Sequence, residues 1–173
     1  IRDISYRYGS DTVLSHFSYT FEKGFIYGIT APSGTGKTTL LNLIGNILKP
    51  AQGEIETDFK TGIAYVFQEP ELLSQLTIAE NIALPLAAYL KKEIAFEQAI
   101  SILQKMELDG FENRFPNELS FGQQQRAAIA RALTYPSPLL LMDEPFKGLD
   151  EALSRRIIKR IRERQTENGQ TIL

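Results

Sequence analysis

A short loop rich in glycine, serine and threonine carries the clearest chemical signal in the sequence, and it reads Ala31-Pro32-Ser33-Gly34-Thr35-Gly36-Lys37-Thr38-Thr39. Gly34 and Gly36 let the backbone curl so that successive N–H groups point toward an anion, and Lys37 adds a positive charge. A helix after such a loop directs its positive end at the same place. The loop therefore predicts a site for phosphate groups, with the Thr38 hydroxyl available to Mg²⁺.

The flanks of this loop have the order that a phosphate-binding loop requires. Residues 25–30 are apolar and β-favouring, which predicts a short buried strand. Residues 39–45 place apolar side chains on one helical face and end at Gly45. The alternative is a polar loop that joins a strand to a helix without binding phosphate, because short motifs also occur by chance.

Two adjacent acids, Asp143 and Glu144, follow the apolar run 139–142, which predicts a strand buried on both faces. Carboxylates next to a buried strand are costly unless a positive charge lies opposite them. Asp143 therefore fits a Mg²⁺ ligand, and Glu144 fits the base for an attacking water. Two exposed acids at the end of a strand are the alternative.

Three further side chains are weaker candidates. Gln68 follows the apolar strand predicted for residues 63–67, where open α/β sheets place ligand-contacting groups, but a surface glutamine is equally typical. Tyr8 could stack on an adenine ring, although its alternating sequence alone favours a half-buried strand tyrosine. His16, the only histidine, is given no role.

The remaining elements must position these side chains. Residues 1–24 alternate in polarity and predict an antiparallel hairpin layer with a turn at residues 9–11. Residues 69–118 predict several helices, with a capping box that begins at Thr77. Ser120 is a natural N-cap for the next helix, and Gly122 leaves its first turn open to an anion, although this is also simply a capped helix. Residues 151–164 predict an amphipathic helix whose basic outer face is solvated.

The overall composition narrows the function classes. The 173 residues predict one domain, and the net charge of −2 gives no general attraction to nucleic acid. The absence of cysteine excludes disulfides and thiolate metal sites, and no apolar run reaches the roughly 18 residues of a membrane span. We expect a cytosolic protein. We also expect both ends to be incomplete, because the chain begins at Ile1 rather than at Met and stops at Leu173 within an apolar strand pattern.

In order and spacing these motifs resemble the nucleotide-binding ATPase domain of ABC transporters. The resemblance extends from about Tyr6 to Leu173 and rests on Tyr8, APSGTGKTT, Gln68, LSFGQQQR, LLLMDEP and GLD. It implies an α/β fold of the P-loop NTPase class, with a mainly parallel central sheet, an N-terminal antiparallel β layer and a helical subdomain insert. The implied catalytic core is about residues 1–68 and 136–173, and the implied helical subdomain is about residues 69–135.

The resemblance also implies a site shared between two subunits, in which ATP on residues 31–39 of one subunit is closed over by the LSFGQ segment of the other. The implied nucleotide-binding residues are Tyr8, Ser33, Gly34, Thr35, Gly36, Lys37, Thr38, Thr39, Ser120, Gly122 and Gln123. The implied catalytic residues are Glu144, Lys37 and Gln68, and the implied Mg²⁺ ligands are Thr38, Gln68 and Asp143. Asp150 would couple the two sites.

The implied function is an ATP-hydrolysing subunit that powers solute import through a membrane permease, with ATP and Mg²⁺ as cofactors. The implied partners are a second ATPase subunit in a head-to-tail dimer and the permease, with no nucleic acid, on the inner face of the cell membrane. VFQEPELL and DEPFKGLD look most like importers of the nitrate, sulfonate and taurine group. The alternative is a soluble ABC-type ATPase that acts on nucleic acid or ribosomes, which the missing basic field disfavours.

The sequence departs from the family pattern in three places. Ala31 replaces the first glycine of the loop, so a positive φ there would be strained. Phe121 replaces the usual glycine in the third position of the signature, while Ser120 and Gly122 are kept. The switch histidine of the family would follow Leu173, so a chain that ended there is expected to hydrolyse ATP poorly.

Overall fold

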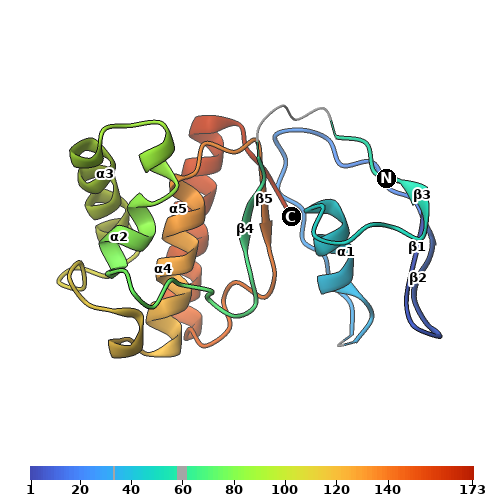
Figure 1. The fold of residues 1–173 in the computed structure, drawn as a ribbon, viewed down its shortest axis with the longest axis horizontal. Coiled ribbons are helices and arrows are strands. Elements are labelled where there is room, and N and C mark those ends of the chain that lie inside the picture. The colour runs from blue at the N-terminus through green and yellow to red at the C-terminus, as the bar shows by residue number, and fades with distance from the viewer. Residues whose placement is uncertain (33, 58–61) are drawn as a thin grey trace.

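The computed structural model describes residues 1–32, 34–57 and 62–173. In chain order, the helices and strands are β1 Arg2–Tyr8, β2 Asp11–Phe17, α1 Lys37–Ile44, β3 Gln52–Glu54, β4 Ala64–Val66, α2 Ile78–Ala83, the 3₁₀ turn η1 Leu86–Ala88, α3 Lys92–Lys105, the 3₁₀ turn η2 Pro116–Glu118, α4 Phe121–Thr134, β5 Leu139–Met142, α5 Glu151–Asn168 and β6 Thr171–Ile172. Helices α2 to α5 lie on one side of the parallel strands, and α1 and the antiparallel strands lie on the other (Figure 1). The α/β class is as predicted.

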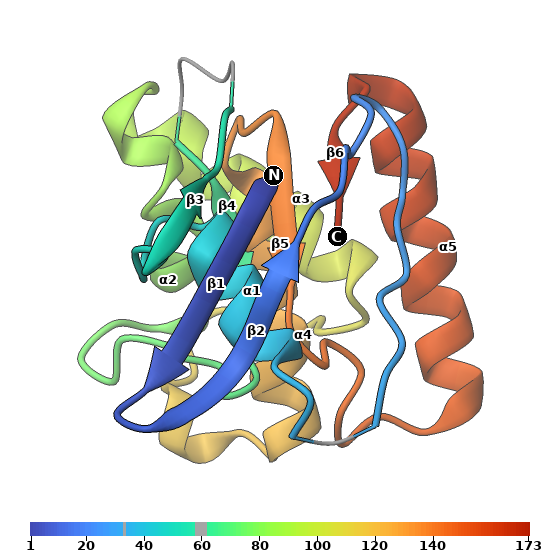
Figure 2. The same ribbon diagram turned by 90° about the vertical axis from the view of Figure 1, so that its right-hand side faces the viewer.

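The antiparallel layer has the strand order β2-β1-β3, and it lies in front of α1 in Figure 2. The predicted hairpin is confirmed, but its second strand begins at Asp11, directly after a tight turn in which Gly9 has φ +58°. Asp3 and His16 also have positive φ, and both lie where the pairing of β1 with β2 is irregular. The His16 Nδ1 atom lies 2.9 Å from Asp3 Oδ1. His16 is thus bonded locally to Asp3, and it takes no part in the candidate site.

The parallel sheet has the order β4-β5-β6, and the segment before the glycine loop joins its far edge through a bridge between Ile26 and Ile172. The prediction of a buried strand over residues 25–30 is therefore wrong in part. Phe25 is 55% exposed and Ile26 is 44% exposed, because this segment has a strand neighbour on one side, and that neighbour is two residues long. Consequently β6 lies between the loop-bearing segment and β5.

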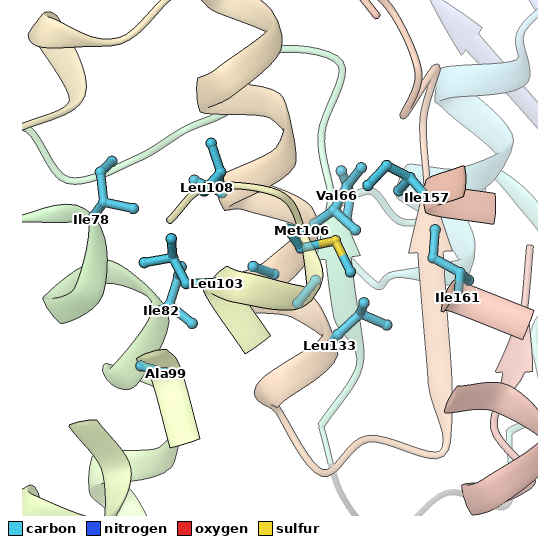
Figure 3. Close-up of a cluster of buried hydrophobic side chains, with 14 of the residues drawn as sticks. Val66, Ile78, Ile82, Ala99, Leu103, Met106, Leu108, Leu133, Ile157 and Ile161 are labelled. Carbon is cyan, nitrogen blue, oxygen red and sulfur yellow. The ribbon is translucent and has the colours of Figure 1, made fainter. Parts of the chain in front are cut away.

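Strand β5 is the centre of the hydrophobic core, as its four apolar residues predict. Successive side chains of a strand point to opposite faces. Leu140 accordingly packs into the cluster formed with α4 and α5, whereas Leu139 and Leu141 pack into the cluster formed with α1. Figure 3 shows the first cluster, in which Val66 of β4 lies beside Ile157 of α5.

The helical region begins with the predicted capping box, in which the Thr77 hydroxyl accepts from the Glu80 N–H at 3.2 Å and the Glu80 carboxylate accepts from the Thr77 N–H at 2.8 Å. Buried side chains of α2, α3 and α4 belong to the same cluster as β4 and α5. The boundaries of a catalytic core and a helical subdomain stay a prediction. Over the described ranges, no helix is both long enough and apolar enough to span a membrane.

Candidate functional site

The glycine loop leads into α1, as predicted, but α1 already begins at Lys37, two residues before the helix predicted over residues 39–45. Gly34 has φ +78° and Gly36, the N-cap of α1, has φ +92°. These left-handed conformations strain any residue with a Cβ atom, so the two glycines are required where they stand. Ala31 does not have a positive φ, and the loop therefore tolerates its methyl group. Ser33, predicted to bind nucleotide, lies outside the described residues.

The Lys37 ammonium lies over the loop and is held by backbone carbonyls. Its Nζ donates to the carbonyl oxygens of Ala31 at 2.8 Å and Pro32 at 3.0 Å. Oxygens of a phosphate group can replace these neutral acceptors, and a charged acceptor makes the stronger hydrogen bond. Beside it, the Thr38 side chain is exposed, whereas Thr39 is only 6% exposed.

Lys37 shares a cavity of about 500 Å³ with the two predicted acids, Asp143 and Glu144. Asp143 follows β5 and is 4% exposed. Within the described ranges, its carboxylate has no hydrogen-bond donor and no cation as a partner. Burial, and secondarily the charge of Asp143, raise the pKa of the Tyr65 hydroxyl well above its usual range. A buried carboxylate without a partner is costly, and a cation bound at this position would remove that cost.

Glu144 is exposed and adopts a left-handed backbone conformation with φ +45°. The Gln68 side chain, which follows β4, donates from Nε2 to Glu144 Oε2 at 3.4 Å. The two side chains are 76 residues apart in the sequence, and the parallel pairing of β4 with β5 brings them together. The carboxyl ends of β4 and β5 thus place Gln68 beside Glu144 at one edge of the sheet.

Tyr8 lies at the end of β1, is 52% exposed and packs edge to face against Tyr6 at 5.0 Å. Its hairpin is packed on the glycine loop, because a Cβ atom on Gly36 would lie 2.6 Å from the side chain of Val13. The structure thus puts the strand pair that carries Tyr8 against the phosphate-binding loop.

Ser120, Gly122 and Gln123 lie at the start of α4. Ser120 caps the helix by accepting from the Gln123 N–H at 3.4 Å, and the Gln123 side chain accepts from the Ser120 N–H at 2.8 Å. This reciprocal capping box goes beyond the single N-cap that the sequence predicts. In the described part of the chain, these residues are not among those that line the cavity around Lys37. Asp150 caps α5 by accepting from the Leu153 N–H at 2.8 Å.

Sequence reasoning missed a contact between three residues of this region. The Lys147 ammonium lies 3.2 Å from the Glu69 carboxylate and 5.5 Å from the centre of the Phe121 ring. Each residue comes from a different segment, and Glu69 and Lys147 are 78 positions apart. No local pattern in the sequence signals such a contact.

The described ranges contain no cluster of three or more His, Cys, Asp or Glu side chains able to hold a metal ion. A metal bound here would therefore depend on few protein ligands. Mg²⁺ is commonly held in this way, by one or two carboxylates together with substrate phosphates and water.

A glycine loop that opens a helix, beside a buried parallel strand that ends in two acids, defines the P-loop class of α/β proteins. The model of the family described as ABC transporter matches residues 14–147. The chain therefore belongs to the ABC transporter family.

Known relatives agree with this assignment. The thiamine import ATP-binding protein ThiQ of Shigella flexneri serotype 5b is 42% identical over 152 residues, which are 82% of this chain and 66% of that protein. The chain thus spans about 66% of the length of this relative. These relatives do not single out the nitrate, sulfonate and taurine group, so that finer assignment stays a prediction.

Two solved structures share the fold. The ATP-binding cassette MJ0796, in a dimeric post-hydrolysis state bound to ADP and Pi, has a TM-score of 0.88 and 34% identity, and covers 99% of this chain and 84% of its own. CbiO1 from Clostridium perfringens, part of the transporter complex cbiONQ, has a TM-score of 0.81 and 28% identity, and covers 99% and 75%.

Proposed function

We propose that this protein binds and hydrolyses ATP as the motor subunit of a membrane importer. The observation that supports this most directly is the cavity that Lys37 shares with Asp143 and Glu144. It combines a phosphate-binding cation, a buried carboxylate suited to a metal ion, and an exposed carboxylate suited to a water molecule. Phosphoryl transfer requires these three parts, since its catalysis is mainly positioning and charge stabilisation.

In the proposed mechanism, the loop amides and Lys37 bind the β- and γ-phosphates, and the Tyr8 ring stacks on the adenine. The Thr38 hydroxyl, Gln68 and Asp143 would hold Mg²⁺, which neutralises charge on the phosphates. Glu144 accepts a proton from the attacking water. The water oxygen bonds to the γ-phosphorus, and the bond between the γ-phosphorus and the oxygen that leaves with ADP breaks. The products are ADP and inorganic phosphate.

The start of α4 would act on a second copy of the chain. Ser120, Gly122 and Gln123 are outside the cavity of their own subunit. A head-to-tail dimer would bring them to the γ-phosphate on the partner's loop, and the capped N-terminus of α4 would direct its positive end at that anion. The dimeric cassette MJ0796 supports this arrangement.

The transport partner would be a permease at the inner face of the membrane, contacted by the helical region of residues 69–135. The protein itself would lie in the cytoplasm, without nucleic acid as a ligand. Thiamine is the first solute to test, because relatives 42% identical to this chain are named for thiamine import. Copurification with a membrane protein supports this assignment, and copurification with ribosomes or DNA alone contradicts it.

The catalytic assignment is tested by two substitutions with matched controls. Glu144→Gln should slow ATP hydrolysis by about 10²–10⁴-fold, the usual contribution of a general base, while ATP-bound dimers accumulate in size-exclusion chromatography. Glu151→Gln, which changes an exposed glutamate with a side chain 80% accessible, is the control. Lys37→Ala should weaken binding of a fluorescent ATP analogue, whereas Lys159→Ala should not. Unchanged turnover in Glu144→Gln contradicts the mechanism.

A further inference from the structure

A closed circuit of contacts surrounds the turn that carries Glu144. Gln68 donates to the Glu144 carboxylate at 3.4 Å, and the next residue, Glu69, pairs with the Lys147 ammonium at 3.2 Å. The Lys147 N–H closes the circuit by donating to the Glu144 carbonyl at 3.1 Å. The segments after β4 and β5 are therefore joined at two points, one on each side of the turn.

The start of α4 packs on this circuit through Phe121, which stands where the family usually has glycine. The Lys147 ammonium lies over the Phe121 ring at 5.5 Å, within the range of a cation–π contact. The two backbones also interlock, since a Cβ atom on Gly148 would lie 2.7 Å from the Phe121 ring and one on Gly122 would lie 2.6 Å from the Gly148 carbonyl oxygen.

Glu144 needs such support because its backbone is unfavourable. A glutamate at φ +45° persists only where surrounding contacts fix it. The hydrogen bond from Lys147 to the Glu144 carbonyl fixes one end of the turn, and the Lys147 side chain is itself anchored between Glu69 and Phe121. Without that anchor, the turn loses its ion pair with Glu69 and its contact with the Phe121 ring, and only the Gln68 hydrogen bond still holds the Glu144 carboxylate.

We propose that Lys147, anchored by Glu69 and Phe121, is a positioning residue that sets the Glu144 carboxylate for attack and ties it to the start of α4. This inference rests on the proposed function. It adds a direct connection within one subunit between the carboxylate of its own ATP site and Ser120 and Gly122, which would close the partner's site. Phe121 is then an adaptation that provides the ring on which Lys147 rests.

The test compares Lys147→Met with Lys147→Arg in steady-state ATP hydrolysis. Met keeps the unbranched apolar stem of the side chain and removes its charge, whereas Arg keeps the charge and stacks well on aromatic rings. We expect Lys147→Met to lower kcat by about 5- to 20-fold, because small displacements of a catalytic group have effects of this order or larger. The KM for ATP should change less than about 2-fold, and Lys147→Arg should recover most of kcat.

Lys159→Met is the matched control, because Lys159 forms a solvent-exposed pair with Glu163 at 3.9 Å on α5, outside the circuit. Its kcat should equal that of the wild type. Glu69→Gln should lower kcat as Lys147→Met does. The double variant should be no slower than the slower single variant, because both substitutions remove the same ion pair between Lys147 and Glu69. Phe121→Leu should also lower kcat, since it removes the ring and keeps an apolar side chain.

Two results overturn the inference: a kcat for Lys147→Met equal to that of the control, or a loss that Lys147→Arg does not recover. A lowered melting temperature with normal kcat would likewise assign Lys147 a merely structural role. Failure of the proposed function looks different. If the proposed function is wrong, Glu144→Gln hydrolyses ATP as fast as the wild type. If only the inference about Lys147 is wrong, Glu144→Gln is slow and the Lys147 variants have the kcat of the wild type.

Discussion

Replacing Gly122 by alanine tests how closely the start of α4 approaches the turn after β5. Gly122 is the second residue of α4, and its backbone φ is not in the left-handed region, so alanine adopts its conformation without strain. In an open helix, this change would stabilise the protein by up to about 1 kcal/mol, because glycine is a poor helix former. The structure predicts the opposite sign.

The magnitude follows from one distance. The new Cβ atom would lie 2.6 Å from the Gly148 carbonyl oxygen, whereas ordinary contacts begin at 3.4 Å, so a backbone atom must move by several tenths of an ångström. Overpacking of this kind costs about 1–3 kcal/mol. After subtraction of the helix-propensity gain, we expect a destabilisation of about 1 kcal/mol, or about 2–4 °C in Tm for a chain of this size.

The assay is urea unfolding followed by circular dichroism, in parallel with ATP turnover. Gly28→Ala is the matched control, because a Cβ atom at Gly28 would have no neighbour within 4 Å and its φ is also outside the left-handed region. The control should be unchanged or slightly more stable. If Gly122→Ala is as stable as the wild type or more so, with normal turnover, then α4 and the 148 turn are not in contact as described.

Three further predictions concern stability. A hydrogen bond from Arg156 lowers the pKa of the Glu107 carboxyl. The ion pair therefore stabilises the fold above the ordinary pKa of 4.5, and this contribution is lost as the pH falls through the lowered pKa of the folded state. Glu107→Gln should be less stable than the wild type at pH 7, and the urea midpoints of the two proteins should converge in acid. Ile157→Ala removes a side chain with no exposed surface and should cost about 2–5 kcal/mol in urea unfolding, and a loss below about 1 kcal/mol would contradict the packing in Figure 3. Thr77→Ala removes the N-cap of α2 and should cost about 1 kcal/mol, whereas Thr77→Ser should restore it.

The sequence predicted elements best where side-chain burial alone decides the structure. Strand β5 was predicted with its observed bounds, because a short apolar run that is followed by acids and proline is typical of a strand covered on both faces. The run at residues 25–30 is also mostly apolar, but its pairing depends on how long its neighbour is. A pattern within one segment does not contain that information, so the predicted strand is only a bridge at Ile26.

The candidate site shows the same division. The loop glycines, Asp143 and Glu144 were predicted because each belongs to a motif that is continuous in the sequence. Lys147 and Glu69 were missed because their contact joins two loops, and exposed charged residues have no periodicity that reveals a partner. The proximity of Gln68 to Glu144 was recoverable only from the rule that parallel strands end at one edge of the sheet.

The position of β6 has a consequence for how the chain folds. Gly24, just ahead of the glycine loop, donates its N–H to the Thr171 hydroxyl, which is 147 residues further along the chain. On the ribosome, the loop segment thus remains without its sheet partner until nearly all of these residues have been made. Contacts of such high sequence separation form slowly and leave edges open to aggregation in the meantime. The segment that leads into the phosphate-binding loop therefore completes its sheet pairing only after a strand about 147 residues further along has been made.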